Sequence, residues 1–256
     1  QKLGRPMGTY ITLACEQAMT VSLETRRALA AELAQTLRSM LPPDMKTALV
    51  VGLGNRSVTP DSLGPRTAER VLVTRHMGDC LPRDVPMSSV CAAAPGVLGV
   101  TGMETAEILR GMVSHVKPDA VIAVDALAAR SSKRIASTIQ ITDTGITPGS
   151  GVGNHRKALD RRTLGVPVIA VGVPLVVYAS TIAFDALCAL GEGEVEEERI
   201  AACVERVVSE KLGEMIVTPR DVDALVERMA GVLADGINQA LHPSLSSSEI
   251  AQLMAQ

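Results

Sequence analysis

The chain has almost no aromatic residues: its 256 residues include no Trp, one Phe and two Tyr. The core must therefore be built from aliphatic side chains, and apolar residues make up 46% of the sequence. Such a composition suits buried parallel strands covered by helices. The shortage of aromatic rings argues against the stacking platforms that bind RNA or single-stranded DNA. The net charge of −3 gives no broad basic surface, so we expect no direct nucleic-acid partner.

Long apolar runs and paired cysteines are also missing. No apolar run approaches the ~20 residues of a membrane span, and no secretory signal is present. We therefore expect a cytoplasmic protein without a membrane partner. The cysteines are odd in number, scattered and never spaced C-x-x-C, which favours reduced thiols over disulfides or zinc. They are Cys15, Cys80, Cys91, Cys188 and Cys203.

The spacings of common metal and nucleotide sites are absent too. The segment 50–65, VVGLGNRSVTPDSLGP, contains Gly52-x-Gly54 after an apolar run. It has neither the Lys-Ser/Thr of a Walker loop nor the third Gly of a dinucleotide fingerprint. The four His are isolated, without H-x-x-x-H spacing, so we expect no metal and no cofactor. They are His76, His115, His155 and His242.

The sequence does contain a regular alternation of strands and helices. The apolar runs predict strands at 48–53, 88–93, 119–125, 135–142 and 166–173. Helical periodicity and capping residues predict helices at 23–40, 65–77, 102–116, 179–190, 195–213 and 219–241. Thr101 with Glu104 reads as a capping box for the third helix, and Thr218 as the cap of the last one.

This alternation predicts an α/β fold, with a mostly parallel twisted sheet and helices on both faces. We expect one domain over residues 1–256, with a helical C-terminal part at about 179–256. In such folds the ligand site lies beyond the carboxyl ends of the strands.

Three acids follow predicted strands. Asp61 lies in the loop after the first strand, Asp125 ends the strand 119–125, and Asp143 follows the strand 135–142. Two carboxyl groups that share a proton provide a base and an acid, and can activate water against a carbonyl group. The alternative for each Asp is a helix cap or an ordered turn, and the sequence leaves both open.

The glycine-rich loop 143–154, DTGITPGSGVGN, offers weaker candidates. Ser150 lacks the outer glycines of G-x-S-x-G, so a tight turn is the favoured interpretation over a nucleophile. We expect Asp143, Ser150 and Asn154 of this loop, with Asn55 of the first loop, to bind substrate or support the catalytic acids.

Several long motifs occur together in one order. They are VVGLGNRSVTPDSLGP, PGVLGVTGMETAEIL, AVDALAAR, TIQITDTGITPGSGVGNHRK and LGVPVIAVGVP, flanked by GRPMGTYITL near the start and MIVTPRDVDALVERMAGVLADGINQALH near the end. In this order they resemble the germination protease family of endospore-forming bacteria. The resemblance covers nearly the whole chain.

The resemblance implies an atypical aspartic endopeptidase that degrades small acid-soluble spore proteins in the spore core during germination. It also implies a zymogen, a homotetramer and a fold related to the hydrogenase maturation proteases. The two family aspartates match Asp61 and Asp125. The family's targets are cut beside a Glu, and Arg130 in AVDALAAR is the expected partner of that carboxylate.

The sequence departs from the family pattern at several places. Leu175 and Tyr178 stand where relatives carry Thr and Asp, Thr147 stands where many carry His, and the segment between Leu190 and Met215 is short. Two alternatives follow: a metal-dependent processing peptidase of the hydrogenase maturation type, or a non-catalytic relative. The absence of His at position 147 counts against the first, and intact Asp61 and Asp125 count against the second.

Overall fold

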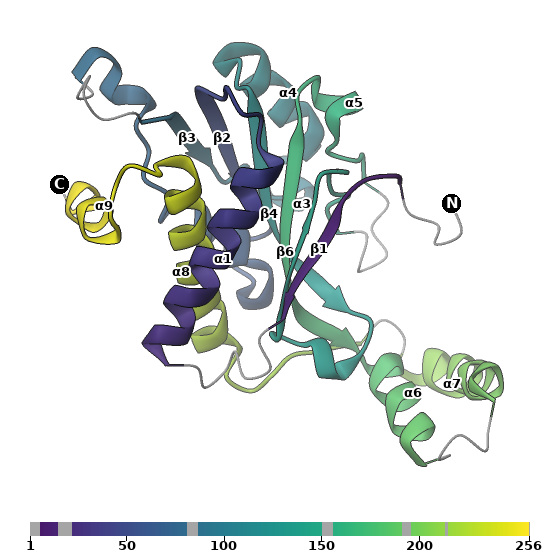
Figure 1. Ribbon diagram of the computed structural model, residues 1–256. Helices are drawn as coiled ribbons and strands as arrows, with labels where there is room; N and C mark the ends of the chain where they lie inside the picture. Colours follow the sequence, from purple (N-terminus) through teal and green to yellow (C-terminus); the bar gives the residue numbers. More distant parts are fainter. Residues whose placement is uncertain are drawn as a thin grey trace.

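The computed structural model describes residues 6–14, 22–80, 87–149, 156–190, 196–212 and 215–255. Within these residues seven strands form one sheet in the order β1-β5-β6-β4-β2-β3, and β7 pairs with β6 outside this path (Figure 1). The strands are β1 (Tyr10–Ala14), β2 (Thr47–Gly52), β3 (Ser89–Ala93), β4 (Ala120–Ala129), β5 (Thr138–Thr142), β6 (Val168–Tyr178) and β7 (Ile216–Val217).

The sheet has a parallel part and an antiparallel edge. β3, β2, β4 and β6 are parallel neighbours, whereas β5 runs antiparallel to β6, and β1 antiparallel to β5. β2, β4 and β6 are mostly buried, as expected for strands covered on both faces, whereas the edge strand β3 has one buried residue. This confirms the predicted α/β sheet, although β1 and β7 are missing from the predicted strands.

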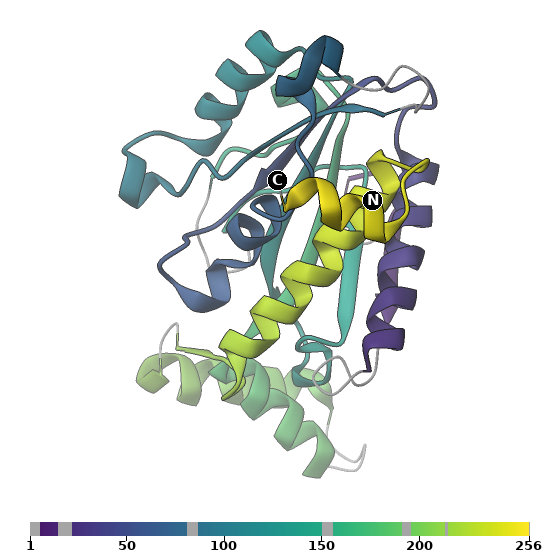
Figure 2. The same cartoon turned by 90° about the vertical axis from the view of Figure 1, so that its left-hand side faces the viewer.

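Helices cover both faces of this sheet. The helices are α1 (Leu23–Met40), α2 (Leu63–Ala68), α3 (Leu98–Thr101), α4 (Thr105–Val116), α5 (Arg161–Leu164), α6 (Ala179–Leu190), α7 (Glu197–Leu212), α8 (Val222–Leu241) and α9 (Ser247–Met254), with 3-10 turns η1 (Thr59–Asp61), η2 (Arg75–Cys80) and η3 (Ser132–Arg134). α1 and α8 lie side by side over one face, which Figure 2 shows in purple and yellow-green. α4 packs over the other face.

The helices after residue 179 fall into two groups. α6 and α7 pack against each other beyond the end of β6, away from α1 and α8 (Figure 1). α8 returns to the sheet and buries the predicted apolar face, which includes Leu225, Val226, Met229, Leu233 and Ile237. Among the described residues, no helix is long and apolar enough to cross a membrane.

Two strands are longer than predicted. β4 was expected to end at Asp125 but continues to Ala129, and β6 continues to Tyr178. The two strands keep pairing beyond Asp125, with a register shift between Leu127 and Ala128. The extra length therefore comes from a partner strand, which the apolar pattern of one segment does not report.

The predicted helix 65–77 was too long. α2 ends at Ala68, and Asn238 of α8 bonds to the backbone of the segment that follows. The Leu72 N–H donates to Asn238 Oδ1 at 2.8 Å, and Asn238 Nδ2 donates to the Arg70 carbonyl at 3.0 Å. A distant side chain thus binds the backbone of a segment that the sequence predicts to be helical.

Both predicted caps were also wrong. Thr101 lies inside the short α3, where its hydroxyl bonds to the Val97 carbonyl, and α4 begins after Glu104 without a side-chain cap. Thr218 does not cap α8, which begins at Val222 after Asp221. Residues 216–217 are still extended there, because they pair with the end of β6.

Candidate active site

Asp125 is a buried carboxyl group in the middle of the sheet. It lies on β4 opposite Gly172 of β6 and is 5% exposed. Its Oδ1 accepts a hydrogen bond from the Ala126 N–H at 2.9 Å. Burial, and next the negative charge of Asp61, raise the pKa of Asp125 to about 8, against the opposing effect of the Ala126 hydrogen bond. Asp125 therefore keeps its proton at neutral pH.

Asp61 lies at the end of η1, in the loop that follows β2. The Asn55 N–H donates to Asp61 Oδ2 at 2.6 Å. The pKa of Asp61 is raised from its ordinary value, because partial burial outweighs the Asn55 hydrogen bond and the positive charge of Arg156, which both lower it. Asp61 therefore has two stabilising partners for its ionised form.

The neighbouring strands bring these two acids together. β2 and β4 are parallel neighbours in which Gly52 is level with Val124, and the Leu53 N–H donates to the Val124 carbonyl at 2.8 Å. The loop after β2 consequently starts beside Asp125. Two adjacent carboxyl groups in unlike surroundings form an acid and a base of different strength, the arrangement that hydrolytic carboxyl pairs use.

The glycines of this loop allow the chain to approach itself closely. Gly54 has a φ of +113°, and a Cβ there would lie 2.0 Å from the Asp61 carbonyl oxygen. A Cβ on Gly64 of α2 would lie 2.2 Å from the Leu53 carbonyl oxygen and 2.5 Å from that of Val124. The glycines therefore serve to hold Asp61 against the end of the sheet rather than to surround a phosphate.

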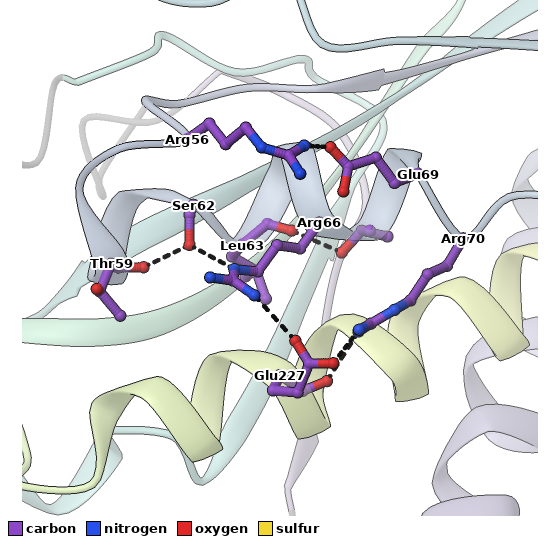
Figure 3. Close-up of polar contacts among 9 residues, drawn as sticks. Arg56, Thr59, Ser62, Leu63, Arg66, Glu69, Arg70 and Glu227 are labelled. Atoms are coloured by element: carbon purple, nitrogen blue, oxygen red, sulfur yellow. Dashed lines mark hydrogen bonds and ion pairs between the residues drawn. The ribbon is translucent and has the colours of Figure 1, made fainter.

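A polar network ties the Asp61 loop to α8 (Figure 3). The buried Ser62 hydroxyl donates to the Thr59 carbonyl at 2.8 Å and accepts from Arg66 Nε at 3.0 Å. Arg66 Nη1 in turn pairs with Glu227 at 3.0 Å, and Arg70 pairs with the same carboxylate. The residue next to Asp61 is thus connected to a helix that packs on the sheet.

The part of the chain that the structure describes contains no group of three His, Cys, Asp or Glu residues suited to hold a metal ion. The pair itself offers two carboxyl groups, and a hard cation needs six or more oxygen ligands. A metal at the pair would have to take the rest of its shell from water or substrate.

Comparison with known proteins identifies the family. A family model described as "Germination protease" matches residues 1–190 and 186–254. The chain belongs to the germination protease family. It is therefore a peptidase.

Curated relatives in the germination protease family match over nearly the whole chain. The germination protease of Clostridium acetobutylicum is 44% identical over 272 residues, covering 98% of this chain and 83% of the relative. That of Caldanaerobacter subterraneus subsp. tengcongensis is 43% identical, with 98% and 84% covered. That of Bacillus mycoides is 39% identical, with 94% and 80% covered.

Among solved structures, the chain is similar to a [NiFe] hydrogenase maturation protease, HycI, from Thermococcus kodakarensis. The two are 18% identical with a TM-score of 0.39, and the match covers 79% of this chain and 98% of that one.

The other predicted site residues differ in whether the structure places them at the pair. Asn55 lies at the pair and contacts Asp61 through its backbone, while its side chain accepts from the Ser57 N–H at 3.0 Å. Ser150 and Asn154 lie outside the described residues. Among the predicted supporting residues that the structure describes, Asn55 is the one with a hydrogen bond to the pair.

Asp143 is not brought to the pair. β5 runs antiparallel to β6, so its last residue, Thr142, is level with Ala170 near the start of β6, whereas Asp125 is level with Gly172. The exposed Asp143 carboxylate instead accepts from the Thr9 N–H at 2.8 Å and anchors the segment before β1. The rule on carboxyl ends applies to parallel strands, and β5 is not one of them.

Arg130 also lies away from the pair. It is exposed and follows the last residue of β4, five positions beyond Asp125. At 3.3 Å per residue this is about 16 Å along the strand. A contact between Arg130 and a substrate carboxylate stays a prediction, and it requires a peptide that extends along β4.

The structure shows where the residues that depart from the family pattern lie. Leu175 is fully buried in the apolar core, Tyr178 is the last residue of β6, and Thr147 is half-buried beyond Ile146.

Glu227, which pairs with Arg66 in the network beside Asp61, was not predicted from the sequence. It is 161 positions from Arg66, and nothing in the periodicity of α8 distinguishes it from other polar positions.

Proposed function

We propose that Asp61 and Asp125 form the catalytic pair of an aspartic endopeptidase. The observation that supports this best is the contrast between the two carboxyl groups. Asp125 is buried and holds its proton, whereas Asp61 accepts a backbone hydrogen bond and has a nearby cation. Asp61 is then the general base and Asp125 the general acid.

The reaction follows from these protonation states. Asp61 takes a proton from a water molecule, and the water oxygen attacks the carbonyl carbon of the peptide bond. Asp125 gives its proton to the carbonyl oxygen, which produces a neutral tetrahedral intermediate. Asp61 then passes its proton to the leaving nitrogen, the C–N bond breaks, and Asp125 recovers a proton from the hydroxyl that becomes the new carboxyl group.

The turn-ordering alternative fits Asp125 poorly. A buried carboxyl group whose own hydrogen bond comes from the next residue along the chain contributes little to the fold. No described Lys or Arg forms an ion pair with it. Burying it beside a second acid instead costs stability, which is the pattern expected of groups kept for function.

The substrates follow from the family rather than from the geometry. The relatives carry the name germination protease, so we propose small acid-soluble spore proteins, degraded in the spore core during germination, as substrates. A zymogen form and a homotetramer belong to the same proposal. Sedimentation velocity of the purified chain tests the tetramer directly.

The aspartate pair is tested by two nearly isosteric substitutions. Asp61→Asn and Asp125→Asn should each lower cleavage of a small acid-soluble spore protein by roughly 10²- to 10⁴-fold, because each removes a proton-transfer group. Cleavage is followed by gel and mass spectrometry, and melting curves report folding. Near wild-type turnover in either variant would show that the substituted carboxyl group is not needed for catalysis.

Asp119→Asn is the matched control. Asp119 precedes β4, and its carboxylate accepts from the Lys46 and Thr47 N–H groups far from the pair. It should keep full turnover. The same assay with a chelator distinguishes the aspartic mechanism from the metal-dependent alternative. Complete inhibition that is reversed by added metal would show that the peptidase depends on a metal ion.

A further inference from the structure

One buried cationic nitrogen has no hydrogen-bond partner beside the pair. Within the described residues, five buried side-chain nitrogen or oxygen atoms lack a partner, and one of them is Arg156 Nη1. The other four belong to Arg26, Thr138, Arg228 and His242. Unpaired buried donors are rare in folded proteins, and a charged one is especially unfavourable, so each requires an explanation.

The chain shortly after Arg156 is held by the core. Three residues later, Leu159 is fully buried and exchanges two backbone hydrogen bonds with Ile146, at 3.0 and 2.7 Å. Leu159 packs in the same apolar cluster as Leu53, the residue that leads into the Asp61 loop. The segment that carries Arg156 is therefore anchored against the end of β2.

The charge of Arg156 reaches the pair. Its positive charge opposes the rise in the pKa of Asp61 that burial causes, yet its Nη1 does not bond to that carboxylate or to any other described group. Other cations differ from it. Lys157 is exposed, and Arg130 lies beyond the end of β4. Arg56 and Arg66, each five positions from Asp61, form ion pairs with glutamates. Arg156 thus combines proximity to Asp61 with an unused buried donor.

We infer that Arg156 is a further catalytic residue, whose Nη1 donates a hydrogen bond to the carbonyl oxygen of the peptide bond being cleaved. This inference rests on the proposed aspartate mechanism. The carbonyl oxygen has two acceptor positions, one for the Asp125 proton and one for Arg156. Negative charge develops on this oxygen while water attacks and before the proton has fully moved.

A fixed cationic donor at that oxygen stabilises the transition state more than the bound substrate. The free chain carries the unpaired nitrogen because the partner arrives with the substrate. An Arg that only balanced the charge of Asp61 would be expected to bond to it directly, with two parallel N–H···O contacts.

The test compares kcat and KM for the wild type, Arg156→Met, Arg156→Lys and Lys157→Met on a peptide cut from a small acid-soluble spore protein. Arg156→Met should lower kcat by roughly 10²- to 10³-fold, as for the loss of other oxyanion donors, and change KM little. Arg156→Lys keeps the charge but not the direction, and should lose at least roughly tenfold in kcat. Lys157→Met removes a neighbouring exposed charge and should match the wild type.

A second measurement does not depend on turnover. A phosphinate analogue of the same peptide carries a charged tetrahedral oxygen at the position of the carbonyl oxygen. Calorimetry should show that Arg156→Met loses affinity for the phosphinate by about the same factor as its kcat/KM. Its affinity for the uncleaved peptide, measured in the Asp125→Asn background, should stay within about threefold.

The outcomes separate this inference from the proposed function. One outcome keeps the aspartate mechanism but shows that Arg156 is not catalytic. In that outcome the wild type is active, both Asp→Asn variants are inactive, and Arg156→Met has the wild-type kcat. A rise in KM alone would also overturn the inference, because it would show binding of the ground state. If Arg156→Met does not fold, wild-type kcat in Arg156→Lys overturns it. A wild type that cleaves no peptide overturns both proposals together.

Discussion

The carboxyl group of Asp125 makes the stability of the chain depend on pH in an unusual direction. Most native acids have a lowered pKa and stabilise the fold as they ionise. Asp125 has a pKa raised from 3.8 to about 8, so the folded chain binds a proton that the unfolded chain has already lost. Its contribution to the free energy of unfolding is therefore largest below about pH 4 and falls as the pH rises to about 8.

Asp125→Asn should remove this decline. The amide stays neutral at every pH, so the variant should gain stability relative to the wild type as the pH rises from 4 to 8. Each pKa unit corresponds to about 1.4 kcal/mol, so the relative gain should be on the order of a few kcal/mol at pH 8. Urea denaturation of both proteins at pH 4, 6 and 8 measures it.

Asp119→Asn serves as the control of opposite sign. Backbone hydrogen bonds from Thr47 and Lys46 lower the pKa of Asp119, so the wild-type carboxylate stabilises the fold above its unfolded pKa and loses this effect in acid. This variant should be less stable than the wild type at pH 7 and approach it in acid. A difference between Asp125→Asn and wild type that does not change with pH would contradict the buried, protonated state of Asp125.

At the scale of elements, the contact between α2 and the ends of β2 and β4 positions Asp61. The backbone of α2 reaches these strands because Gly64 has no side chain. A methyl group there would overlap backbone oxygens of Leu53 and Val124, and backbone cannot move aside as a flexible side chain does. α2 would have to shift, and the Asp61 loop that precedes it would shift too.

Gly64→Ala should therefore lower both stability and turnover. Overpacking of this kind costs about 1–3 kcal/mol in the free energy of unfolding. Displacing Asp61 should lower kcat by more than the folded fraction explains, which urea denaturation and steady-state kinetics on the same sample would show. An active, fully stable Gly64→Ala protein would contradict the close approach of α2.

Gly111→Ala is the matched control. Gly111 lies within α4, and a Cβ there would meet no atom within 4 Å. Alanine is favoured over glycine in a helix by about 1 kcal/mol. This variant should be slightly more stable than the wild type and equally active.

For the whole molecule, the pair α6 and α7 forms a part that is only loosely attached. No residue of α6 is buried, in contrast to α8, where most of one face is. Asp185 joins α6 to the end of β4: its Oδ2 accepts from the Ser132 N–H and hydroxyl, both at 2.7 Å, and from the Ser131 hydroxyl at 3.2 Å. We expect α6 and α7 to open without unfolding of the sheet.

Asp185→Ala should loosen this attachment. Hydrogen bonds to a charged group contribute about 1.5 kcal/mol or more, so amide exchange in α6 should become roughly tenfold faster. Hydrogen–deuterium exchange with mass spectrometry measures this by segment, with peptides from β2 and β4 as the reference. The exposed Glu198 of α7 supplies a control, since Glu198→Ala removes a carboxylate that forms no ion pair among the described residues. Equally faster exchange in β4 would show that the whole molecule opens as one unit.

The sequence by itself indicated most of the strands and helices, and it singled out two acids as candidates. Apolar runs of the parallel strands, and the apolar face of α8, depend on burial, which leaves a local pattern in the chain. Asp61 and Asp125 could be chosen because each follows or interrupts such a run at the end where parallel strands place their loops. The family could be recognised because its motifs are long and colinear.

Only the tertiary structure decided how these elements combine. The direction of β5, which takes Asp143 away from the pair, and the extra length of β4, which carries Arg130 beyond it, depend on strand pairing. A local pattern reports that a residue is buried but not which strand it meets or in which direction. The contrast between Asp61 and Asp125, and the unpaired nitrogen of Arg156, arise from desolvation and charge at sites built from distant segments, and such contacts exist only once the chain has folded.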